Sequence, residues 1–178
     1  MIRPSRRAAV CPADGQVAAD IRFVAIAQLR TTYEHLRPAT LPWRSELSAE
    51  LPIRVAICAD DGVYEVVDGF KRLSDWRERG YEIVPVVLEP VASVAEHKRM
   101  LLAANAPART TTALDEARVV CSLMSEEHWS AGQVARFLGH KPRWVERRVD
   151  LGTKLSPGAQ DRLARGSIGP SLAHALTA

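Results

Sequence analysis

The hydrophobic and polar positions of the N-terminal half alternate at the spacing of β-strands. Two such runs, IRVAICA (53–59) and VYEVV (63–67), are separated by Asp60, Asp61 and Gly62. An Asp-Gly pair between β-rich runs is typical of a hairpin turn. A helical pattern then runs from about Gly69 to Arg79, and a third strand-like run, IVPVVL, covers 83–88. The pattern therefore predicts strand, strand, helix and strand in close succession.

After Pro90 the pattern becomes helical and stays helical. A helix is expected from Ser93, and three further helix starts carry polar residues that resemble N-terminal capping signatures. These are Thr112 with Asp115, Ser130 with Gln133, and Ser156 with Gln160, the last with Pro157 at the first helical position. We therefore expect an α+β chain, with a small α/β part followed by an all-α part.

These patterns divide the chain into segments with different character. Residues 1 to 20 lack periodicity and are rich in Ala, Arg and Pro, which is typical of a flexible arm. The expected domains are an α/β domain over 21–104, a hinge over 105–112 and a helical domain over 113–178.

Composition places the chain among globular proteins of ordinary size. The 178 residues are 47% hydrophobic and 25% charged, enough to bury a core. No run of about 18 apolar residues indicates a membrane span, and no secretory signal is visible. The three cysteines form no CxxC pair, so neither a disulfide framework nor a zinc ribbon is indicated. We therefore expect a cytoplasmic protein with no membrane partner.

The positive charge is concentrated in the C-terminal third. Residues 130 to 166 carry eight Lys or Arg against three Asp or Glu, whereas residues 1 to 129 carry sixteen against eighteen. A basic segment is often only a solvated surface, but it is also what a nucleic-acid-binding surface requires.

The segment 130–151 has the spacing of a helix-turn-helix. Ala135 is small where two helices would cross, and Gly139 supplies the turn conformation. The second helix would then project its basic side chains outward, and such a helix fits the major groove of double-stranded DNA. The expected DNA-binding residues are Lys141, Arg143, Trp144, Arg147 and Arg148.

These residues divide by chemistry. Arg143 and Arg147 are expected to contact bases, because arginine pairs bidentately with guanine. Lys141 and Arg148 are expected to contact phosphates, which position the protein without specifying sequence. Trp144 could stack on DNA, but a tryptophan on a short helix more often packs. The alternative is an ordinary helical hairpin whose exposed face is basic.

A second basic feature is the start of the helix after VYEVV. Lys71 and Arg72 follow Asp68 and Gly69, although the N-terminal end of a helix favours anions. Either these side chains are solvated, or the turn and helix start hold a phosphate group.

Taken in order, these features resemble ParB-type partition proteins. The likeness covers about residues 21 to 170 and includes GFKR at 69–72, the proline and valine of P-I-x-V at 52–55, and LDEARVV from Leu114. The resemblance implies a ParB/sulfiredoxin-like α/β domain that binds CTP with magnesium, and a helical domain that binds a palindromic site as a homodimer. It also makes a partition ATPase a candidate partner.

The family's nucleotide motifs are only partly present. Its Gly-Glu-Arg-Arg phosphate motif falls on 69–72, where Phe70 replaces the acid. Its Glu-Asn-x-x-Arg motif falls on Ala104 and Asn105, so the carboxylate that would hold magnesium is absent. The implied nucleotide-binding residues are Gly69, Lys71, Arg72 and Asn105, with no catalytic or metal-binding residue.

Three hypotheses remain open at this point. The first is sequence-specific DNA binding of ParB type in plasmid or chromosome partition, with nucleotide regulation and without CTP hydrolysis. The second is a metal-dependent nuclease or phosphotransferase on the same core, against which Ala104 argues. The third is a transcription or replication regulator of a mobile element whose ParB-like domain no longer binds nucleotide.

Overall fold

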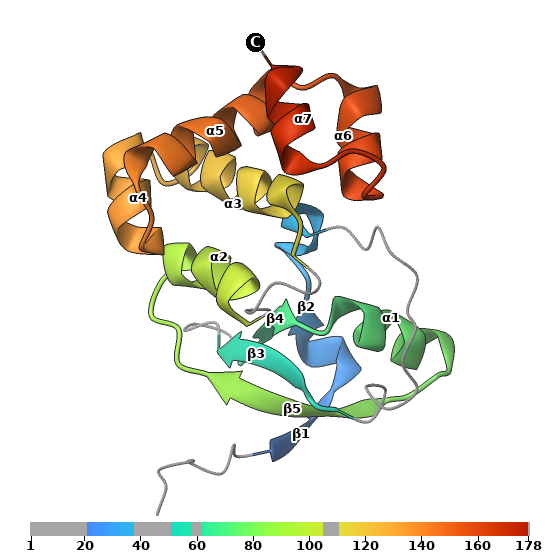
Figure 1. Ribbon diagram of the computed structural model, residues 1–178. Helices are drawn as coiled ribbons and strands as arrows, with labels where there is room; N and C mark the ends of the chain where they lie inside the picture. Colours follow the sequence, from blue (N-terminus) through green and yellow to red (C-terminus); the bar gives the residue numbers. More distant parts are fainter. Residues whose placement is uncertain (1–20, 38–50, 58–61, 105–110, 178) are drawn as a thin grey trace, which may run out of the picture.

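A computed structural model describes residues 21–37, 51–57, 62–104 and 111–177. A mixed sheet with α1 beside it forms one lobe, α2 lies on this lobe, and the remaining helices form a second lobe above α2 (Figure 1). The strands are β1 (Ile21–Ala25), β2 (Leu29–Arg30), β3 (Ile53–Ile57), β4 (Tyr64–Asp68) and β5 (Ile83–Glu89). The helices are α1 (Phe70–Glu78), α2 (Val94–Ala103), α3 (Ala113–Ser125), α4 (Ala131–Leu138), α5 (Pro142–Thr153), α6 (Pro157–Ala164) and α7 (Pro170–Ala175), with short 3-10 turns η1 (Ile26–Gln28) and η2 (Glu34–Leu36).

The sheet has the order β1-β5-β3-β4-β2. Strands β3 and β4 pair antiparallel, with Ile57 opposite Tyr64, which confirms the predicted pairing of these two runs. Strand β3 also pairs parallel with β5, and α1 provides part of the connection from β4 to β5. Residues 21–30, which alternate only loosely, divide into β1, η1 and β2 at the two edges of the sheet. The residues of the Asp-Asp turn lie outside the described ranges.

Two of the three capping signatures form as predicted. Thr112 and Asp115 make a capping box at α3, and Ser130 and Gln133 make one at α4. The prediction for Ser156 was wrong, because its side chain makes no capping bond. Gln160 stands four residues after the cap, one too many for a capping box, and its amide donates to the Leu155 carbonyl (2.9 Å). The helix still begins at Pro157.

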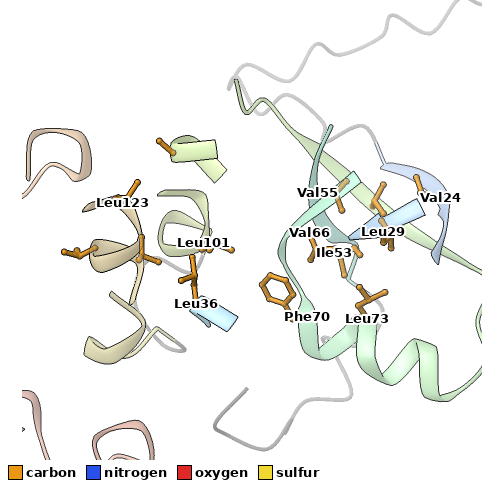
Figure 2. Packing of buried hydrophobic residues seen from close by; sticks show 14 of the residues in the cluster. Val24, Leu29, Leu36, Ile53, Val55, Val66, Phe70, Leu73, Leu101 and Leu123 are labelled. Atoms are coloured by element: carbon orange, nitrogen blue, oxygen red, sulfur yellow. The ribbon is translucent and has the colours of Figure 1, made fainter. Parts of the chain in front are cut away.

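One hydrophobic core runs through both lobes. It includes Ile53, Val55 and Val66 of the sheet and Leu123 of α3. Phe70 of α1 is buried, and Figure 2 places its ring between the sheet residues and Leu36. Phe70 thus packs in the core at the position where the family motif has an acid. A second cluster joins the α3 N-terminal turn to α5, α6 and α7.

A buried ion pair also connects the lobes. Lys98 of α2 is 0% exposed, and its Nζ donates to Glu126 Oε2 (2.9 Å) and Glu127 Oε1 (2.7 Å) just after α3. Burial lowers the pKa of Lys98, but the hydrogen bonds to Glu127 and Glu126 outweigh burial and raise it overall. The lobes are therefore held together by paired charge as well as by apolar packing.

Among the described residues, the structure contains no helix that is both long and apolar enough to cross a membrane.

Candidate functional site

The turn between β4 and α1 depends on Gly69. This residue caps α1 with a left-handed backbone, φ +99°. A Cβ atom at this position would lie 2.5 Å from Ile53 Cγ2 and 2.9 Å from Arg72 Nη2. Glycine is therefore required here both by the backbone conformation and by close packing. The atoms nearest to this added Cβ belong to the side chains of Ile53 and Arg72.

Arg72, predicted to contact phosphate, is buried and bonded to the protein. Its Nη1 donates to the carbonyls of Leu51 and Pro52 (both 2.8 Å), and its Nη2 donates to Asp68 Oδ2 (3.1 Å). Burial lowers the pKa of Arg72, opposed by the nearby Asp68 carboxylate. Both terminal nitrogens of the guanidinium are therefore bonded within the protein, and its predicted contact with a phosphate stays a prediction. Arg72 instead fixes the start of β3 to the start of α1.

Lys71 and Arg37 add further positive charge near this turn. Arg37 Nη1 donates to the Leu101 carbonyl (3.2 Å) and lies 3.9 Å from Asp68 Oδ1. Burial lowers the pKa of Lys71 and repulsion from Arg37 lowers it further, whereas attraction to Asp115 opposes both effects. A bound anion would relieve this repulsion. Arg37 was missed by the sequence reasoning, because no pattern indicates that residues 34 positions apart meet.

The other predicted nucleotide residue, Asn105, lies outside the described residues. Its neighbour Ala104 is the C-terminal cap of α2 and has no side-chain oxygen to offer a metal. The parts of the chain that the structure describes contain no group of three His, Cys, Asp or Glu side chains able to hold a metal ion.

The second candidate site is the α4–α5 pair. Gly139 has φ +73° and ends α4, and the His140 amide donates to the Ala135 carbonyl (2.8 Å). Val134 and Ala135 of α4 and Val145 of α5 are 0% exposed, so the predicted apolar contacts are buried. The other two predicted contact residues, Leu138 and Val149, are partly buried against the same core. Helix α5 also packs extensively on α3.

The face of α5 away from this core is basic and exposed. Lys141, Arg143 and Arg147 are all exposed. Arg143 and Arg147 are four residues apart and lie on one face of the helix. Neither forms an ion pair with any residue in the described ranges. Their charge is therefore available to an external anion.

Trp144 and Arg148 do not project outward, contrary to the prediction. The Trp144 ring is stacked on His140 at 3.8 Å, and the Arg148 guanidinium lies 4.8 Å from the Trp144 ring centroid. Arg148 Nε also donates to Glu116 Oε2 of α3 (2.6 Å). Arg148 thus joins α5 to α3 through Glu116, and Trp144 is partly buried against the core, consistent with its packing interpretation. Arg148 lies against α3 because its ion-pair partner is Glu116, which is 32 residues away in sequence.

Comparison with known proteins shows similarity in fold. No family model and no curated protein matched the sequence. A Pnob8-like ParB-N domain is 12% identical, with a TM-score of 0.50, over 88% of this chain and 78% of that chain. The chain has a ParB-type fold.

Two solved structures of C-terminally truncated ParB from Caulobacter crescentus are also similar to this chain. The form bound to the centromeric parS site is 23% identical over 88% of this chain and 84% of that one, with a TM-score of 0.46. The form bound to CTP-γ-S is 20% identical over 88% and 91%, with a TM-score of 0.36. At these identities the likeness concerns the fold, and the function has to be argued from the residues of this chain.

Proposed function

We propose that this protein is a sequence-specific DNA-binding protein of ParB type that acts in plasmid or chromosome partition. The α4–α5 pair serves as its helix-turn-helix, and the helical part from residue 113 to 178 as its DNA-binding domain. The observation that supports this most strongly is the pair of exposed arginines on α5, Arg143 and Arg147, which have no carboxylate partner among the described residues. Uncompensated cations on an exposed helix match the negative potential of a DNA groove.

The roles of the basic residues follow from their surroundings. Arg143 and Arg147 contact base edges from within the major groove. Lys141, at the N-terminal cap of α5, contacts a backbone phosphate and sets the position of the helix. Arg148 acts indirectly, because it pairs with Glu116 of α3, and Trp144 supports it by lying against the Arg148 guanidinium.

The α/β domain, over residues 21–104, binds the phosphates of CTP and regulates DNA binding. Support comes from the position of Lys71 and Arg37, two cations near the β4–α1 turn that attract a phosphate although Asp68 and Asp115 partly offset their charge. Arg72 takes no part, since its donors are used within the protein. The described residues do not fit a magnesium site, because Ala104 offers no oxygen ligand. The proposed role of CTP is therefore binding without hydrolysis.

A palindromic site read by two copies, and an interaction with a partition ATPase, complete the proposal. A second candidate is a transcription or replication regulator of a mobile element that binds DNA without nucleotide. The buried Phe70 and the internally bonded Arg72 favour it. CTP separates the two, because a ligand of the native state must raise the melting temperature. A CTP-dependent shift that Lys71→Ala abolishes supports nucleotide regulation, whereas no shift at millimolar CTP supports the second candidate.

DNA binding is tested by selecting bound duplexes from a random pool and titrating the winner in increasing salt. The expected result is an enriched palindrome whose affinity falls steeply with salt, because each neutralised phosphate adds about 0.9 to the slope of log K against log salt. No salt-dependent binding to any duplex at low ionic strength would refute the proposal.

A further inference from the structure

A cleft of about 460 Å³ lies where α2 meets the α4–α5 turn. Arg99, Leu102 and Ala103 of α2 form one wall, and the residues from Arg136 to His140 form the opposite wall. Thr111, Glu116 and Trp144 complete the lining. This volume lies in the range of small-molecule sites. The cleft shares no lining residue with the β4–α1 turn or with the exposed face of α5.

The charge of this cleft is uncompensated. Arg99 and Arg136 are both exposed, and neither forms an ion pair with a residue in the described part of the chain. The carboxylate that lines the cleft, Glu116, is already paired with Arg148. Because Arg148 neutralises Glu116, the two lining arginines, Arg99 and Arg136, leave two net positive charges on guanidinium groups suited to oxyanions.

Two further features indicate what kind of anion fits. Thr111 Oγ1 is buried and makes no hydrogen bond in the described structure, although buried polar atoms normally have a partner. An oxygen of a ligand would supply that partner. Apolar and aromatic side chains line the rest of the cleft. Arg99 lies 5.4 Å from the Phe137 ring centroid, and the exposed His140 ring stacks on Trp144. A flat ring could therefore lie beside the anionic group.

We propose that this cleft binds a small organic oxyanion, a carboxylate or phosphate monoester attached to a flat ring. Arg99 and Arg136 bind the oxyanion and Thr111 donates its hydroxyl to it. The ring packs against the Phe137 and His140 side of the cleft. This site does not depend on the proposed DNA binding, and its ligand differs in position from any nucleotide held at the β4–α1 turn.

Isothermal titration with defined probes tests the site on the full chain. Benzoate and phenyl phosphate are the two candidate chemistries, inorganic phosphate is the head group alone, and benzamidine is a ring of opposite charge. We expect at least one ringed anion to bind more tightly than inorganic phosphate, and benzamidine not to bind. A ringed anion that binds no better than phosphate would refute the role of the ring. The absence of binding by all three anions at 10 mM would overturn the site.

Variants locate the binding. Arg99→Ala and Arg136→Ala are each expected to weaken the best probe about tenfold, since each removes a charge-assisted contact. Thr111→Val should weaken it less, with Arg99→Lys intermediate. Arg79→Ala is the matched control, because Arg79 is an exposed arginine at the C-terminal cap of α1 and is paired with Asp75. Circular dichroism confirms that each variant is folded. The assignment would be refuted if both Arg99→Ala and Arg136→Ala bound the best probe as tightly as the wild type. It would also be refuted if Arg79→Ala weakened binding by the same amount.

Discussion

Arginines near the start of α1 and on α5 differ in what surrounds them. Arg72 is buried and donates to two carbonyls and a carboxylate. Arg143 and Arg147 are exposed and have no ion-pair partner among the described residues. Arginine therefore stabilises the fold in α1, whereas in α5 its charge is available to a ligand. Whether an arginine can bind a ligand therefore depends on the hydrogen bonds and ion pairs that it already makes within the protein.

The largest expected effect that separates the two regions is on stability. Arg72→Ala should lower the free energy of unfolding by about 3 kcal/mol, because it removes a buried guanidinium that binds the Leu51 and Pro52 carbonyls and pairs with Asp68. Arg147→Ala should change it by less than about 0.5 kcal/mol, as expected for an exposed residue. Urea unfolding followed by circular dichroism measures both. Equal losses in the two variants would remove the distinction.

The β4–α1 turn gives the next largest effect. Gly69→Ala should cost about 2–3 kcal/mol, since it adds a clash with Ile53 Cγ2 to the cost of a positive φ. Gly139→Ala is the matched control, because Gly139 also has positive φ but an added Cβ would meet nothing within 4 Å. It should cost about 1 kcal/mol. Thermal unfolding of the two variants isolates the packing part, and a smaller loss at Gly69 would contradict the structure.

The sequence predicts well those features that depend on neighbouring residues. Thr112 and Ser130 form their capping boxes because the partner stands three residues away. Gly139 adopts the left-handed conformation expected at the end of α4. In the candidate sites, the exposure of Arg143 and Arg147 also follows from helical periodicity.

The sequence does not show contacts between distant segments. The bonds from Arg72 to Leu51 and Pro52 cross about 20 positions, and Arg37 reaches the same turn from η2. The pairing of Arg148 with Glu116 has the same origin. Such pairs depend on how helices and strands pack, which no local pattern encodes. For this reason the bonds that Arg72 and Arg148 make within the protein could not be predicted from sequence alone.

Arg148 is less exposed than Arg143 and Arg147 but more exposed than Arg72. Its substitution should therefore have an intermediate effect on stability. Arg148→Ala should lower the free energy of unfolding by about 1 kcal/mol, because the pair with Glu116 is only partly exposed. Its effect on DNA affinity should be indirect and should appear in Glu116→Gln as well. If Arg148→Ala weakens DNA binding while Glu116→Gln leaves it unchanged, Arg148 contacts DNA directly.

The smallest expected effect is the response of the Lys98 cluster to acid. Hydrogen bonds from Lys98 and Ser122 lower the pKa of Glu126, so the folded state favours its ionised form. Its contribution to stability is complete above the ordinary glutamate pKa of about 4.3 and is lost as the pH falls through the lower folded-state value. Melting temperatures between pH 3 and pH 7 should show this loss in the wild type and less of it in Glu126→Gln. Parallel curves would rule out a contribution from Glu126.

The central claim is that Arg143 and Arg147, the exposed arginines of α5 that have no ion-pair partner among the described residues, bind DNA. Fluorescence anisotropy with the selected duplex tests it in variants confirmed to be folded. Arg147→Ala should lose about 1–3 kcal/mol of affinity and relax sequence preference, whereas Lys141→Ala should weaken all duplexes alike and reduce the salt slope by about 1. The claim would be contradicted if Arg147→Ala and the Arg143→Ala, Arg147→Ala double variant both kept the affinity, sequence preference and salt slope of the wild type.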